Sequence, residues 1–149
     1  MMQAPHTYAE WTKVLLLFKE KQDDREVLAA MQQGTLEWQS GVADRFSKRL
    51  IDAVNMRMNA AVDKLHRDMG NARGAEGAIV QALLSLRKEM AFLAQAVDIP
   101  SLPEKYRKQY VQLVLDRANH MQDSLEDSAK KDRSGKQLSI VRNHRVNAF

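Results

Sequence analysis

The sequence predicts an all-α protein: an antiparallel bundle of three long helices, preceded by two short N-terminal helices and followed by a disordered basic C-terminal tail. Three observations predict this fold. The 149 residues are rich in good helix formers, and only 6 Gly and 3 Pro interrupt them. Apolar residues recur at helical spacing through most of the chain, and no stretch alternates as a β-strand does.

The N-terminal part, residues 7–34, is expected to form a hairpin of two short helices. Thr7 and Glu10 have the spacing of a capping box, which begins the first helix. One face of that helix carries Tyr8, Trp11, Leu15 and Phe18. The aspartates at 23–24 are expected to cap the second helix, and Gly34 is expected to end it.

A long helix is expected over residues 35–69, because apolar residues return to one helical face throughout this stretch. That face carries Val42, Phe46, Leu50, Val54, Met58, Ala61 and Leu65. Residues 70–77 contain three of the six glycines and predict a hinge. We expect residues 1–131 to form a single helical domain.

Residues 78–131 predict a hairpin of two helices with heptad spacing, joined by a loop that contains Pro100 and Pro103. The first of these helices has an apolar row, named here the heptad seam, which consists of Ile79, Leu83, Leu86, Met90, Leu93 and Val97. Further apolar residues beside the seam, such as Val80 and Leu84, favour more than one neighbour for this helix. We therefore expect the seam to be buried and to mediate self-association into a homo-oligomer.

The tail, residues 132–149, differs from the rest of the chain in charge and in pattern. From Lys130 onward the chain has six basic residues and one acidic residue, whereas the rest has 17 basic and 18 acidic residues. The tail shows neither helical nor strand periodicity, so we expect it to be disordered. Its deletion from Arg133 onward is then expected to change the thermal midpoint by only a few degrees.

The composition argues against several classes of function. The chain has no Cys, which excludes disulfides and fits a cytoplasmic location. The longest apolar run, residues 14–18, is too short to span a membrane. His66 and His120 are not expected to lie level with each other, and no serine has the sequence context of a nucleophile. We predict no catalytic residues, no metal site and no cofactor.

These observations favour a non-catalytic protein-interaction protein, such as an adaptor, an assembly factor or a regulator, whose basic tail orders on a protein partner. The residues expected to contact the partner are Lys130, Lys131, Arg133, Lys136, Arg142, Arg145 and Phe149. The alternative is a regulator that binds nucleic acid without sequence specificity through the tail, with help from the N-terminal helices or from Lys48, Arg49 and Arg57. A metal-dependent helical-bundle enzyme is the third hypothesis.

Overall fold

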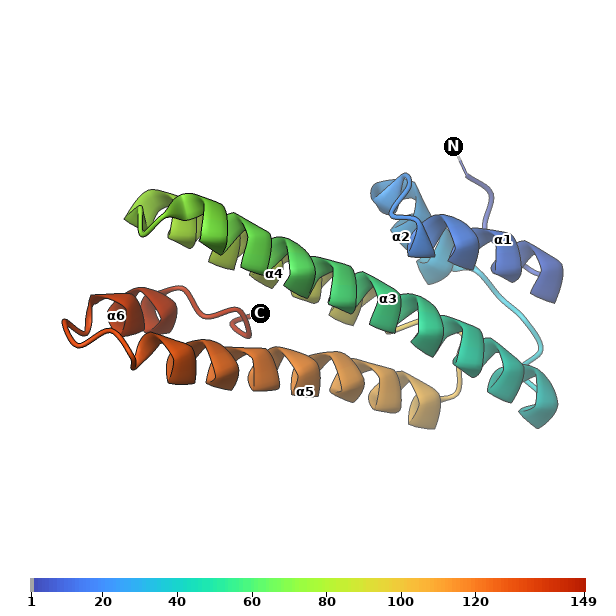
Figure 1. Ribbon diagram of the computed structural model, residues 1–149. Helices are drawn as coiled ribbons and strands as arrows, with labels where there is room; N and C mark the ends of the chain where they lie inside the picture. The colour runs from blue at the N-terminus through green and yellow to red at the C-terminus, as the bar shows by residue number, and fades with distance from the viewer. Residues whose placement is uncertain (1) are drawn as a thin grey trace. The chain divides into compact units, whose positions relative to one another are not determined.

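The computed structural model describes residues 2–149 and confirms the all-α prediction: these residues form six helices and no strand (Figure 1). The helices are α1 (Tyr8–Lys19), α2 (Asp24–Gln33), α3 (Ser40–Ala72), α4 (Glu76–Ala96), α5 (Glu104–Ala129) and α6 (Lys136–Asn143). Within residues 2–149, no helix combines the length and the apolar character that crossing a membrane requires.

The chain divides into two compact units, and each unit consists of two separate segments of sequence. Unit 1 contains Met1–Met58 and Ala94–Val111, and unit 2 contains Asn59–Leu93 and Gln112–Phe149. We describe each unit by itself. The antiparallel arrangement of the three long helices in one bundle stays a prediction.

In unit 1, the capping box at the start of α1 is confirmed. The Glu10 amide donates to Thr7 Oγ1 at 3.2 Å, and the Thr7 amide donates to the Glu10 carboxylate at 3.1 Å. Of the predicted apolar face, Trp11, Leu15 and Phe18 are buried and Tyr8 is half-buried. The N-terminal sequence therefore positions Tyr8 at the edge of the unit.

The loop between α2 and α3 is longer than the sequence predicts, because α3 begins at Ser40 and not at Thr35. The Thr35 amide donates to the Pro5 carbonyl at 2.9 Å, and the Thr35 carbonyl accepts from Trp11 Nε1 at 3.2 Å. The backbone groups that would begin a helix here are thus bound to the N-terminal segment. The Trp38 ring packs edge-on against Trp11, with 5.7 Å between ring centroids, so the loop completes the aromatic core of unit 1.

Arg57 on α3 is a buried cation in the core of unit 1, with 3% of its surface exposed. Its guanidinium donates to both carboxylate oxygens of Asp24 at 2.9 Å, and to the Phe18 carbonyl at 3.0 Å. It also lies over the Phe18 ring, 4.9 Å from the centroid. Arg57 therefore fastens α3 to both short helices, and its charge is not available on the surface for nucleic acid.

In unit 2, α3 ends at Ala72 and α4 begins at Glu76 after a short turn. The turn has two left-handed residues, Arg73 and Gly74. Gly70 and Gly77 lie within helices, so the break is shorter than the stretch 70–77 that the glycines suggest.

The C-terminal tail is ordered, and here the structure differs from the predicted disorder: residues Lys136–Asn143 form α6 beside the last turns of α5 (Figure 1). The apolar side chains of Ile140, Val141 and Val146 are buried, with 6%, 3% and 0% of their surface exposed. Gln122 of α5 is also fully buried, and its side chain donates to the Val141 carbonyl at 3.3 Å and accepts from the Val146 amide at 3.0 Å. This amide side chain therefore binds the tail on both sides of the end of α6.

The turn before α6 is fixed by a carboxylate. Asp132 accepts from the amides of Ser134 and Gln137 at 3.2 Å and 3.1 Å, and from the Ser134 hydroxyl at 2.9 Å. Gly135 adopts a left-handed conformation with φ 75°, which reverses the chain between α5 and α6. The glycine that suggested a flexible tail is thus part of a defined turn.

The attachment of α6 is expected to weaken in acid. Hydrogen bonds from Arg142 and then Gln122 lower the pKa of Glu126 below 4.5, and the Gln137 amide, followed by Ser134, lowers the pKa of Asp132 below 3.8. A lowered pKa in the folded state contributes stability that is complete above the unfolded-state pKa and is lost as the pH falls through the folded-state pKa. We expect amide-exchange protection at Val141 to persist at pH 6 and to fall steeply below about pH 4.

The Glu126→Gln variant tests the cause. The variant should reduce amide-exchange protection at Val141 already at pH 6. Because Gln does not titrate, protection should then fall less between pH 6 and pH 3 than it does in the wild type. Glu104→Gln is the matched control, because within residues 2–149 Glu104 pairs only with the exposed Lys108 on α5. Protection at Val141 that is the same at pH 6 and pH 3 in the wild type would contradict this account.

Candidate functional site

The structure places most of the predicted partner-binding cations in ion pairs within unit 2. Arg142 and Arg145 contact the Glu126 carboxylate at 2.9 Å and 3.9 Å. Lys136 contacts Glu76 at 3.8 Å, and Lys130 contacts Asp127 at 3.6 Å. Four of the six cations are therefore at least partly neutralised by their own chain.

The three remaining residues of the predicted contact set are exposed. Lys131 and Arg133 form no ion pair with any residue in 2–149, and they lie in the turn between α5 and α6. Phe149 exposes 44% of its surface at the end of the chain. The tail consequently offers less free positive charge than its composition suggests.

The six residues of the heptad seam are all buried within the single chain. Leu83, Leu93 and Val97 have no exposed surface, and the other three expose at most 6%. The seam therefore packs inside the protein, and self-association through it stays a prediction.

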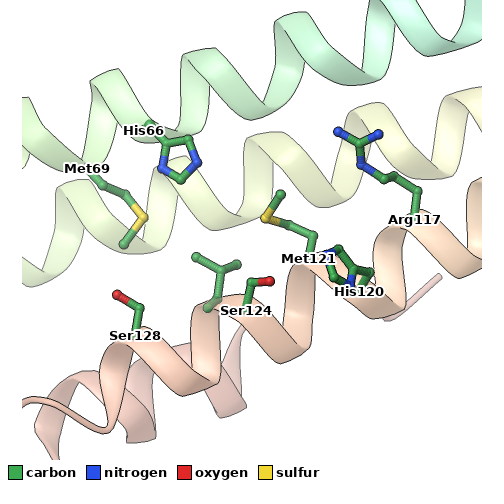
Figure 2. A pocket seen from close by; sticks show the side chains of 8 residues that line it. His66, Met69, Arg117, His120, Met121, Ser124 and Ser128 are labelled. Atoms are coloured by element: carbon green, nitrogen blue, oxygen red, sulfur yellow. The ribbon is translucent and has the colours of Figure 1, made fainter.

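An open groove of about 570 Å³ lies in unit 2 between the C-terminal part of α3 and α5 (Figure 2). Its lining residues are His66, Met69, Arg117, His120, Met121, Ser124, Leu125 and Ser128. Figure 2 shows His66 and Met69 pointing from α3 toward α5, and Ser124 and Ser128 lying opposite them. These residues are brought together from two helices that are distant in sequence.

The α5 wall of the groove is one continuous helix face. Its six residues run from Arg117 to Ser128 at steps of three, one, three, one and three. Eleven steps along an α-helix correspond to a rise of roughly 16 Å, or three turns. Because Ser124 and Ser128 are small, they leave space beside the buried Leu125 that longer side chains would fill.

The polar groups of the groove include several hydrogen-bond donors, and no carboxylate is among the lining residues. Arg117 is half-buried, and its guanidinium donates to Asn59 Oδ1 at 3.0 Å. Within residues 2–149, no Asp or Glu forms an ion pair with Arg117. The groove therefore combines a polarizable apolar floor of Met69 and Met121 with a positive charge that is not neutralised locally.

Beside the groove, α6 borders a second, smaller cavity of about 40 Å³ that shares Met69, Leu125 and Ser128 with the groove. Val141 and Gln137 are among its other lining residues. The position of the tail thus influences the shape of the groove at the Ser128 end.

The two histidines, His66 and His120, both line the groove, and Figure 2 shows them at different points along it. Both side chains are exposed, as expected for polar helix faces. Within residues 2–149, neither Ser124 nor Ser128 is hydrogen-bonded to an imidazole, and no group of three His, Cys, Asp or Glu side chains is placed to hold a metal ion. The described contacts do not assemble a nucleophile with its base.

Sequence reasoning missed Arg117, Met69 and the paired serines as site residues. The signal that could have found them is the pair of small residues, Ser124 and Ser128, four positions apart beside the apolar Met121 and Leu125. Comparisons with models of protein families, with curated proteins and with solved structures find no match to this chain.

Proposed function

We propose that this chain is a non-catalytic protein-interaction protein, which binds an acidic amphipathic helix of a protein partner in the groove of unit 2. The observation that supports the proposal is the lining of the groove: an apolar floor, two hydroxyls, two imidazoles, an arginine and no carboxylate. The tail has a different role from the one expected from the sequence. It folds on α5 and borders the groove instead of ordering on the partner.

The shape of the groove favours a helical ligand. A helix that lies in a groove presents apolar residues at positions i, i+3, i+4 and i+7, which cover two turns or more. The three turns of the α5 wall match that length. Met69 and Met121 are flexible and polarizable, so they adapt to apolar side chains of different shape.

The charge of the groove favours acidic residues on that helix. Arg117 is oriented by Asn59 and retains further N–H groups for a carboxylate. His66 and His120 add ring N–H donors to the lining of the groove. A basic helix would instead place its positive charges near Arg117, and no lining residue of the groove would supply a carboxylate to pair with them.

Two 20-residue helical peptides test the proposal. Both carry Leu at positions i, i+3, i+4 and i+7, and their other positions are rich in Glu in one peptide and in Lys in the other. We expect the acidic peptide to bind at least 10-fold more tightly in fluorescence anisotropy at low salt. The Ser124→Glu variant should weaken its binding at least 10-fold, because it introduces bulk and negative charge into the groove.

Ser85→Glu is the matched control, since Ser85 is exposed on α4 and does not line the groove. It should leave the affinity unchanged. Equal binding of both peptides, or equal effects of Ser124→Glu and Ser85→Glu, would contradict the groove as the binding site.

A further inference from the structure

A second feature, in unit 1, has no part in the proposed function: two arginines of α3 stack on one tyrosine of α1. The guanidinium carbon of Arg45 lies 5.5 Å from the centroid of the Tyr8 ring, and that of Arg49 lies 6.0 Å from it. Tyr8 is half-buried, whereas both arginines are exposed. The Tyr8 ring therefore holds two exposed guanidinium groups close to each other.

Hydrogen bonds orient both guanidinium groups through the nitrogen nearest the side-chain stem. Arg49 Nε donates to the Tyr8 hydroxyl at 3.1 Å, and Arg45 Nε donates to the Gly41 carbonyl at 3.3 Å. The terminal Nη groups of both side chains have no acceptor within residues 2–149. Each arginine thus presents its outer donors to solvent in a fixed orientation.

The carboxylates nearest in sequence do not neutralise this pair. Asp44 accepts a hydrogen bond from the Tyr106 hydroxyl at 2.9 Å, and Asp52 forms no ion pair with any described residue. Elsewhere in the protein such neighbours do pair, as Lys64 and Asp68 do at 2.7 Å. Like charges four residues apart on a helix repel each other. An anion that contacts both guanidinium groups would remove this repulsion.

We infer that Arg45 and Arg49, oriented by Tyr8, form a binding site for the backbone phosphates of a nucleic acid. The planar guanidinium matches the oxygens of a phosphate and binds them with two parallel hydrogen bonds. Lys48 is also exposed on α3, three residues after Arg45. The repeated charges of a nucleic-acid backbone suit several cations on one helix surface better than a single free phosphate does.

The comparison with the tail supports the choice of this surface. Four cations of the tail already form ion pairs with Glu126, Glu76 or Asp127. In contrast, Arg45 and Arg49 have no carboxylate partner in the described part of the chain. The nucleic-acid contact that the sequence suggested for the tail is therefore assigned to α3, with Tyr8 of α1 beside it.

Binding of a fluorescein-labelled 20-base-pair DNA duplex, followed by anisotropy between 50 and 200 mM salt, tests the inference. Two or three phosphate contacts predict a slope of log affinity against log salt of about −1.8 to −2.7, which is a loss of roughly 12- to 40-fold over this range. The Arg45→Gln/Arg49→Gln variant should bring the slope to −1 or flatter and weaken binding at 50 mM at least 10-fold. Circular dichroism checks that the variant remains folded.

The control removes the same charge from the tail. Lys131→Gln/Arg133→Gln changes two exposed cations that form no ion pair, and it should leave the slope unchanged. Tyr8→Leu retains the charges but removes the ring, and it should weaken binding 3- to 10-fold. A slope that flattens in the tail variant and not in the α3 variant would overturn the assignment.

Two further results would also overturn the inference. One is the absence of duplex binding at 50 mM salt. The other is calorimetric binding of inorganic phosphate that requires Arg45 and Arg49 while the duplex does not bind, because the ligand would then be a free phosphate. All these results are independent of the groove in unit 2, so they leave the proposed protein interaction unaffected.

Discussion

Deletion of residues 133–149 is expected to lower the thermal midpoint by about 10–20 °C. The deletion removes the buried side chains of Ile140, Val141 and Val146. Burial of each such side chain stabilises the folded state by about 1.5–3 kcal/mol. Because a compact unfolded chain already buries part of this surface, the expected loss for the three side chains is about 5 kcal/mol. For a chain of this size, 1 kcal/mol corresponds to about 2–4 °C.

The deletion also removes two hydrogen-bond partners of the Gln122 side chain, the Val141 carbonyl and the Val146 amide. Arg133→Ala is the control, because Arg133 is exposed and forms no ion pair within residues 2–149. It should leave the midpoint within a degree or two. Circular dichroism at 222 nm measures both variants. A midpoint of the deletion variant within a few degrees of wild type would show that the tail is the solvated segment its sequence suggests.

Gly34→Ala is expected to destabilise the protein by about 3 kcal/mol, or about 6–12 °C in thermal midpoint. A Cβ atom at Gly34 would lie 2.5 Å from Cζ2 of Trp11 and 2.9 Å from Cγ of Pro5. The Trp11 ring is fully buried, and its Nε1 donates to the Thr35 carbonyl. It also packs edge-on against Phe46, with 5.3 Å between ring centroids. The ring therefore cannot move aside without breaking these contacts.

Gly41→Ala is the matched control for this effect. A Cβ at Gly41 meets no atom within 4 Å, and Gly41 lies in the first turn of α3. Alanine there should stabilise the protein by up to about 1 kcal/mol, because it favours the helix over the unfolded chain. Urea denaturation of both variants gives the free energies of unfolding. Equal values for the two variants would contradict the packing described for Trp11.

Features that depend on near neighbours in the chain could be predicted from the sequence. The start of α1 depends on Thr7 and Glu10, three residues apart, and both hydrogen bonds of the capping box are present. The burial of the heptad seam follows from its spacing, because a row such as Leu83, Leu86 and Met90 shares one helix face.

Features that depend on distant residues could not be predicted. The loop before α3 stays extended because Trp11 binds the Thr35 carbonyl, and no signal within residues 35–39 reveals this bond. An eight-residue helix such as α6 is too short to be stable alone, so its order comes from Gln122 and the surface of α5. A pattern search within the tail therefore finds only charge and irregularity.

The groove could not be predicted from the sequence for a related reason. A groove is space that two helices leave between them, and its lining alternates with core residues along each helix. The sequence identifies His66 and His120 as chemically capable residues, but it does not bring α3 and α5 to the same groove. Likewise, the Tyr8 ring that orients Arg45 and Arg49 lies more than 35 residues earlier in the chain.

The division of unit 1 into two segments has a consequence for biosynthesis. The ribosome makes Met1–Met58 first, then the whole of 59–93, and only afterwards the segment Ala94–Val111 that completes the unit. Gln32 and Trp38 have their hydrogen-bond partners in that late segment. The early segment therefore emerges with apolar surface that it cannot yet cover, and this surface is available to chaperones until residue 111 has been made.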